Sequence, residues 1–324
     1  GGVINSLKSN AKLGKGEWAI LEADESDGSF LKLPINYSVV TNIDYEHLDF
    51  YKNYKNLVES FVQFINKTPP TGKSIICLKN DNIKKILNKI KNKNILTYGE
   101  SKKAKYQIKN IRYHIGYTSF DLKFIDKEKI LKIIKNINVK LLGKHNVLNA
   151  TAALIVCLNL GANLNKAKRS LRNFSGVQRR MTKIFSKGKN DFFDDYAHHP
   201  TEIKEVLDGV KNVYKDYEKI CVFQPHRISR LKDLKKEFTF AFKNADKVIL
   251  FPIYTAGEKL SLGFSYINFA KEIIKNSRVQ LFLVEDNFQL AKFIKANIYG
   301  KKIVIGMGAG TISSWMRELP KLLS

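Results

Sequence analysis

Short apolar runs alternate with segments of helical periodicity along most of the chain, and this pattern limits the possible folds more than any other feature. Continuous apolar runs suit strands that are buried on both faces, as in parallel sheets covered by helices. The sequence therefore predicts an α/β fold. The predicted strands are residues 18–23, 37–42, 74–78, 95–98, 192–195, 220–223, 248–251, 280–284 and 302–305.

Residues 106–140 depart from this pattern, because short alternating runs at 108–113 and 118–124 are typical of antiparallel strands. We predict that they form a small meander on an otherwise mostly parallel first sheet. Helical periodicity then covers 146–160 and continues to about residue 174, where Ser175 and Gly176 interrupt it. We place a domain boundary there, which gives domains 1–175 and 176–324. In the second domain the alternation restarts for about five strands, as in a doubly wound, Rossmann-like sheet.

The length and composition fit an intracellular enzyme. A chain of 324 residues with 44% apolar residues is expected to form about two domains. No apolar run approaches the ~20 residues that span a bilayer, and the N-terminus lacks a signal-peptide pattern, so we expect a cytoplasmic protein without a membrane partner. Cys77, Cys157 and Cys221 are far apart in apolar runs, which predicts buried free thiols.

The net charge of +26 raises the question of nucleic-acid binding. Lysines are, however, spread along the whole chain among many Asn and Ile residues. They do not form the basic ribbon interleaved with aromatic residues that stacks on bases. We therefore predict no nucleic-acid partner, although a basic surface would help to attract an anionic nucleotide.

Two acidic segments follow predicted strands of the first domain. They are EADESD at residues 22–27 and TNIDYEHLD at residues 41–49. Ligands of parallel α/β sheets gather at the carboxyl ends of strands, so Glu22 and His47 can face one crevice. Mg²⁺ prefers a few carboxylate oxygens together with water and substrate phosphates. On these residues alone, solvated loop acids and a helix N-cap explain the pattern equally well.

The segment GKHNVLNATAA at residues 143–153 opens the helix before the domain boundary. Asn146 and Asn149 are three residues apart and lie on one helical face, where each offers the donor and acceptor that an adenine edge needs. An ordinary capped helix with two exposed amides explains the spacing alone at least as well.

Three further segments place basic or histidine side chains after a helix or strand. An arginine of GVQRRM at residues 176–181 can reach nucleotide phosphates or form a structural salt bridge between domains. DDYAHHPTE at residues 194–202 has two adjacent histidines before a helix that begins near Pro200. FQPHRISRLKDL at residues 223–234 presents His226, Arg227 and Arg230 either to an anionic substrate or to solvent.

A glycine-rich turn, IGMGAGTI at residues 305–312, completes the set. Its spacing is not that of a dinucleotide-binding GxGxxG motif, and no acidic partner follows it, so we reject that function. Close approach of its backbone to a substrate remains open. Five of the six histidines lie in the segments described above, and His114 lies elsewhere.

These segments, in this order, resemble the Mur ligases over essentially the whole chain. EADESDGSF, NIDYEHLDFY, GKHNVLNA, DDYAHHPTE and QPHRISRLKDL carry the resemblance. It implies a UDP-binding domain, a central ATPase domain and a C-terminal domain for the incoming amino acid, so residues 1–175 are expected to belong to the ATPase domain and 176–324 to be the amino-acid domain. It also implies a role in peptidoglycan biosynthesis.

The resemblance further implies the substrates UDP-N-acetylmuramate, ATP and L-alanine. The lactyl carboxylate attacks the γ-phosphate of ATP, the alanine amine attacks the resulting acyl phosphate, and Mg²⁺ ions offset the negative charge. It assigns Glu22 and His47 to the metal. It assigns the remaining residues to the nucleotide (Asn146, Asn149, Arg180 and Asp195) and to the alanine and acyl-phosphate end (Tyr196, His198, Arg227 and Arg230). The side chains expected to take part in catalysis are His47, Arg180, His198 and Arg230.

One family feature is missing from the sequence. The GxxGKT[ST] loop that holds the β- and γ-phosphates does not occur, so we expect the chain to begin inside the central domain and to be nearly inactive alone. Another Mur-type ligase, or a catalytically dead binding module, is the alternative. The ligase that recycles tripeptide tends to have Tyr at the position of Ser26 and a longer insertion before its histidine, which makes it the less favoured reading.

Overall fold

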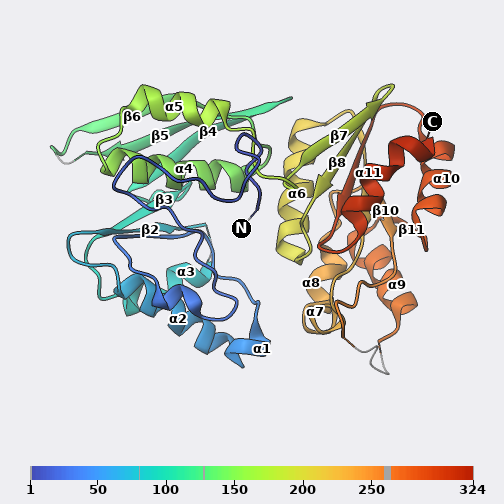
Figure 1. Cartoon of the computed structure of the whole chain (residues 1–324), viewed down its shortest axis with the longest axis horizontal. Coiled ribbons are helices and arrows are strands. Elements are labelled where there is room, and N and C mark those ends of the chain that lie inside the picture. The colour runs from blue at the N-terminus through green and yellow to red at the C-terminus, as the bar shows by residue number, and fades with distance from the viewer. Residues whose placement is uncertain (1, 80, 127, 259–263, 324) are drawn as a thin grey trace. The chain divides into compact units, whose positions relative to one another are not determined.

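The chain forms two compact units in the computed structural model, which describes residues 2–79, 81–126, 128–258 and 264–323 (Figure 1). The first unit contains Ala11–Lys140 and His145–Phe174. The second contains Gly2–Asn10, Leu141–Lys144 and Ser175–Ser324. Each unit has a six-stranded sheet of its own.

The sheet of the first unit is mixed. Its strands, which are neighbours in chain order, are β1 (Tyr37–Val40), β2 (Lys73–Cys77), β3 (Ile95–Gly99), β4 (Tyr106–His114), β5 (Tyr117–Ile125) and β6 (Leu131–Val139). The strands β1 to β4 are parallel, whereas β5 and β6 continue the sheet in antiparallel pairing. The predicted mostly parallel sheet with an antiparallel meander is therefore confirmed.

Within the described residues, seven helices accompany these strands, and most of them bury residues against the core. They are η1 (Ser29–Lys32), α1 (Leu48–Tyr51), α2 (Tyr54–Asn66), α3 (Asp81–Ile86), η2 (Leu87–Lys89), α4 (Lys144–Asn159) and α5 (Leu164–Asn173). The side chain of Asn53 accepts a hydrogen bond from the Asn56 N–H and so caps α2. Phe64 and Ile65 on α2 then join a core that includes Phe30 of η1 and Ile76 of β2.

The prediction of a strand at residues 18–23 is wrong. This segment has no regular secondary structure and pairs with no strand, and Ile20 is 93% exposed. Its Trp18 ring instead contacts the Tyr37 ring edge-on, with 5.6 Å between the centroids. An apolar run indicates a tendency toward burial, whereas a strand also requires ladder hydrogen bonds to a neighbour.

The second unit has a doubly wound sheet. Its strands are β7 (Thr182–Lys187), β8 (Asn190–Asp195), β9 (Glu218–Phe223), β10 (Lys247–Leu250), β11 (Gln280–Leu283) and β12 (Lys302–Met307). Their order is β11-β10-β9-β12-β8-β7, and all pairs are parallel except β7 with β8. The predicted Rossmann-like architecture is confirmed, while the edge strand β7 was not predicted.

Helices cover both faces of this sheet. They are α6 (Pro200–Val213), α7 (Ile228–Asp233), α8 (Lys235–Phe240), α9 (Tyr266–Ser277), α10 (Asn287–Asn297) and α11 (Ile312–Leu323). Alternate residues of β9 point to opposite faces, so Phe223 packs with residues of α6, α8 and α9, and Val222 packs with residues of α10 and α11. The sheet is therefore buried on both sides, which explains its continuous apolar strands.

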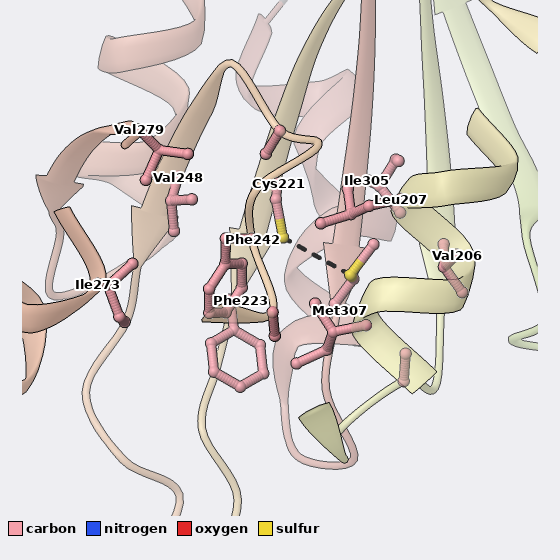
Figure 2. Close-up of a cluster of buried hydrophobic side chains, with 14 of the residues drawn as sticks. Val206, Leu207, Cys221, Phe223, Phe242, Val248, Ile273, Val279, Ile305 and Met307 are labelled. Atoms are coloured by element: carbon pink, nitrogen blue, oxygen red, sulfur yellow. Dashed lines mark hydrogen bonds between the residues drawn. The ribbon is translucent and has the colours of Figure 1, made fainter. Parts of the chain in front are cut away.

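The larger of these cores contains a sulfur contact. Figure 2 shows Cys221 of β9 facing Met307 of β12, with 3.6 Å between Sγ and Sδ. Cys77 and Cys221 are buried free thiols as predicted, but Cys157 is only partly buried. Among the described helices, none has both the length and the apolar character needed to cross a bilayer.

Candidate functional site

The acidic segment of the first unit lies beside His47. The His47 Nε2 is 3.5 Å from Glu25 Oε1, and the Tyr51 hydroxyl donates a hydrogen bond of 2.5 Å to the Glu25 carbonyl. His47 itself has a left-handed backbone (φ 58°) where α1 begins. The hydrogen bond to Glu25 raises the pKa of His47 despite its partial burial. The partner that the structure gives to His47 is thus Glu25, which was not predicted.

Glu22 lies in the same acidic segment and is exposed. Within the described ranges, no group of three or more His, Cys, Asp or Glu side chains is arranged to hold a metal ion. The donor chemistry nevertheless fits Mg²⁺, which takes one or two carboxylates and keeps water and phosphate as its other ligands. The Asp24 pKa is lowered by hydrogen bonds from Ser26, which keeps a further carboxylate ionised nearby. Metal binding by Glu22 and His47 stays a prediction.

The two predicted adenine-binding amides lie on the first turns of α4. Asn146 is half-buried, and its Nδ2 is 2.9 Å from His145 Nε2, whereas Asn149 is exposed. Between them, Val147 and Leu148 are buried and fix the helix on its sheet. This leaves the Asn149 side chain accessible to a ligand, and its contact with a nucleotide stays a prediction.

The second unit gathers aromatic side chains at the carboxyl ends of β8, β9 and β10. The rings of Tyr196 and His198 are 5.1 Å apart, and those of His198 and His226 are 5.9 Å apart. His226 also stacks on Tyr254 at 5.4 Å, and its Nδ1 is 3.3 Å from Arg230 Nη1. The structure therefore brings Tyr196 and His198, which were predicted from one motif, close to Arg230, which was predicted from another. Tyr254, after β10, was not predicted.

Glu202 of α6 holds the segment that carries these rings. Its Oε2 accepts hydrogen bonds from the backbone N–H groups of His198 (3.1 Å) and His199 (3.3 Å) and lies 3.4 Å from His198 Nδ1. Arg180 Nη1 is 3.4 Å from Glu202 Oε1. Burial raises the Glu202 pKa, but His198 and these hydrogen bonds outweigh it, so the pKa is lowered.

The two adjacent histidines have different roles. His198 Nδ1 lies 2.9 Å from the Tyr196 carbonyl and faces the aromatic row. The ring of His199 is buried, and its Nδ1 accepts a hydrogen bond from the Thr201 N–H. With Glu202 it forms the capping box of α6. The structure thus assigns His199 to the helix cap and leaves His198 to face the site.

Asp195 ends β8 in a buried position. Its carboxylate accepts hydrogen bonds of 2.8 Å from the backbone N–H groups of Met181 and Ala197. Burial raises its pKa to about 6, although these two bonds and Arg180 oppose the shift. Asp195 therefore fixes the turn that carries Arg180, and its contact with a nucleotide stays a prediction.

The glycine-rich turn approaches another part of the same unit. A Cβ on Gly310 would lie 2.6 Å from Gln224 Oε1 and 2.8 Å from Tyr254 Cγ. Gln224 Oε1 accepts a hydrogen bond from the Ile312 N–H at the start of α11. The close backbone approach that the glycines permit is thus made to Gln224 and Tyr254.

Arg227 occupies the turn between β9 and α7. It is exposed, its backbone has φ 67°, and its N–H donates to the Tyr254 carbonyl at 2.9 Å. Glu258 accepts hydrogen bonds from the N–H groups of Ile228 (2.7 Å) and Ser229 (3.0 Å) and so caps α7. The Arg227 side chain therefore projects from an anchored turn at the strand ends.

His226 should make stability depend on pH. Burial, followed by the nearby charges of His198 and Arg230, lowers its pKa to about 4 from an ordinary value of 6.5. Neutral His226 therefore favours the folded state above pH 6.5, and this contribution is lost as the pH falls through about 4. We expect wild type to lose stability relative to His226→Gln over this window, measured by denaturant unfolding at each pH. A constant difference between the two proteins, or a ring titration near 6.5 by NMR, would contradict it.

Comparison with known proteins agrees with this architecture. Residues 3–157 match the Mur ligase middle domain, and residues 179–310 match the domain described as Mur ligase, glutamate ligase domain. The chain belongs to the Mur ligase family of ATP-dependent, amide-forming ligases. It is 59% identical over 323 residues to the UDP-N-acetylmuramate--L-alanine ligase of Pelagibacter ubique (strain HTCC1062), covering all of this chain and 70% of that protein.

A more distant relative gives the same family, and two solved structures share the fold. The ligase of the same name from Mesorhizobium japonicum is 38% identical over 325 residues and is covered to 70%. The crystal structure of UDP-N-acetylmuramate-alanine ligase from Thermotoga maritima matches 92% of this chain and 62% of its own, with a TM-score of 0.71 at 24% identity. A MurF ligase from the same organism in complex with ADP matches 89% of this chain and 63% of its own, with a TM-score of 0.66 at 18% identity. These two structures show the fold.

Proposed function

We propose that the protein to which this chain belongs joins L-alanine to the lactyl carboxylate of UDP-N-acetylmuramate at the expense of ATP, in the cytoplasm, during peptidoglycan biosynthesis. The observation that carries the proposal is the 59% identity, over the whole chain, to a ligase of that name. The chain spans 70% of that relative's length, so the proposal concerns the activity of the complete protein.

In the first unit, Glu22 and His47 would hold Mg²⁺, and Asn146 and Asn149 would contact the nucleotide. Mg²⁺ bound there would neutralise part of the phosphate charge. The Glu25 carboxylate, 3.5 Å from His47 Nε2, would orient the imidazole. The exposed amide of Asn149 offers a donor and an acceptor to a base edge.

In the second unit, Arg180 and Asp195 would contact the nucleotide at and near its phosphates. Tyr196, His198, Arg227 and Arg230 would bind the acyl phosphate and alanine. The charges suit this division, because arginine matches phosphate and carboxylate oxygens with paired N–H donors. The low pKa of His226 keeps its ring neutral at pH 7, so it packs beside Arg230 without adding a second positive charge.

A phosphate-release assay tests the proposal. The protein, prepared with the residues that flank this chain in its gene, is supplied with ATP, Mg²⁺, UDP-N-acetylmuramate and single amino acids. We expect release that depends on L-alanine. Preference for a tripeptide would instead favour a recycling ligase, and the absence of release with every substrate would favour a binding module.

A further inference from the structure

We propose that Arg179 is a positioning residue that fixes the Tyr196 ring for substrate binding, and that the buried Asp194 holds Arg179 in place. The inference rests on the proposed function, because it takes Tyr196 to lie at the substrate end of the site. Neither Arg179 nor Asp194 was assigned a role by the motifs. Both belong to the second unit, where all of the contacts below are made.

Arg179 makes four contacts that converge on the end of β8. Its Nη2 donates a hydrogen bond of 2.6 Å to the Gly308 carbonyl, and its Nε lies 3.8 Å from Asp194 Oδ2. Its guanidinium carbon is 4.6 Å from the centre of the Tyr196 ring. Its own carbonyl accepts a hydrogen bond of 2.7 Å from the Tyr196 N–H. Side chain and backbone of one residue thus fix both the ring and the main chain of Tyr196.

The left-handed backbone of Arg179 shows that the surrounding contacts determine its conformation. Its φ is 59°, and Met181, two residues later, has φ 46°. Non-glycine residues adopt this region at a cost that the neighbouring structure has to offset. Here the Met181 N–H bonds to Asp195 while the Arg179 side chain pairs with Asp194, so both ends of the turn are held.

Asp194 is fully buried, and buried charges require partners. Its Oδ2 accepts a hydrogen bond of 2.5 Å from Ser313 Oγ and lies 3.7 Å from Arg317 Nη2 and 3.8 Å from Arg179 Nε. Successive residues of β8 point to opposite faces of the sheet. Asp194 and Asp195 therefore contact the turn of residues 179–181 from its two sides. A buried carboxylate of this kind orients its partner more strictly than a surface ion pair does.

Tyr196 in turn contacts the other residues proposed to bind substrate. The Tyr196 carbonyl lies 2.9 Å from His198 Nδ1, and the His198 ring meets the His226 ring at 5.9 Å. Tyr196 is 36% exposed, so part of the residue is accessible to a ligand, and the Arg179 guanidinium lies over its ring. Loss of the guanidinium would leave the ring free to change rotamer at the point where substrate binds.

Kinetics with three variants test the role. Arg179→Ala is expected to raise the KM for L-alanine by about tenfold to a hundredfold, with a smaller change in kcat, because displacement of a binding group misplaces the substrate. Arg179→Lys keeps the charge but not the planar stack, so it should restore little. Arg317→Ala is the control, because it also removes an arginine beside Asp194, but one whose side chain is 56% exposed. It should leave the KM for L-alanine within about twofold of the wild-type value. Equal effects of Arg179→Ala and Arg317→Ala, or full rescue by lysine, would overturn the proposal.

A second measurement does not depend on turnover. In protein labelled with fluorotyrosine, Tyr196→Phe identifies the ¹⁹F resonance of Tyr196. Arg179→Ala and Asp194→Asn should both shift this resonance, whereas Arg317→Ala should not. An unchanged resonance in Arg179→Ala overturns the positioning role even if the enzyme is active. The Tyr196 resonance could also shift as expected in a protein that releases no phosphate with any substrate. That result would support the contact between Arg179 and Tyr196 and would refute only the proposed function.

Discussion

Glu22→Ala is expected to remove nearly all alanine-dependent phosphate release while the protein remains folded. Loss of a direct carboxylate ligand should lower kcat by more than about a hundredfold, since even partners outside the first coordination shell account for 10- to 100-fold. Glu22 is exposed, so its replacement should leave the unfolding transition unchanged. Binding of Mn²⁺, followed by electron paramagnetic resonance, should weaken in parallel.

Glu17→Ala is the matched control. Glu17 is an exposed glutamate of the same N-terminal segment, and no metal role is proposed for it. It should retain wild-type turnover and Mn²⁺ affinity. Full activity in Glu22→Ala would remove Glu22 from the metal site and direct attention to Asp24 and Glu25, the neighbouring carboxylates.

Phe223→Ala should destabilise the second unit by about 3–5 kcal/mol, the usual cost of removing a buried aromatic side chain. Phe223 is completely buried in the cluster shown in Figure 2, with ring centroids 5.2 Å from Phe242 and 5.9 Å from Phe238. The cavity left by the ring would adjoin the centre of the sheet, where the surrounding strands have little room to collapse.

Trp315 reports this transition, because its ring packs on Phe251 within the second unit. Urea unfolding followed by its fluorescence in a Trp18→Phe background separates the second unit from the first. Phe288→Ala, at a ring that is 69% exposed, is the control and should change the unfolding free energy by no more than about 0.5 kcal/mol. Similar effects of the two substitutions would show that Phe223 is not a central packing residue.

The sequence predicted the buried central strands of the second sheet but missed its edge strand β7. Residues 192–195, 220–223 and 302–305 form the centre of the second sheet, where burial and apolar composition agree. The strand β7, TKIFSK, has only Ile184 and Phe185 as apolar residues, because it lies at the sheet edge. Residues 18–23 have the opposite property, an apolar composition without a pairing partner.

The site was predictable where a motif follows a strand, and less so where contacts join distant motifs. The carboxyl ends of parallel strands collect their loops, which is why Tyr196, His198 and Arg230 lie together. The pairs Glu25–His47 and Asp194–Arg179 depend on side-chain directions that spacing alone does not give.

The position of β12 also determines how the second unit is completed during synthesis. β12, the last of the described strands, is inserted between β8 and β9, which therefore have no direct pairing with each other. Until residue 307 has left the ribosome, two half-sheets are present with open edges that favour association with other chains. A ribosome that stalls in α10 would release a polypeptide with every binding motif before residue 287 but without the strand that joins them. Such products are expected to be substrates for chaperones and proteases rather than partly active enzymes.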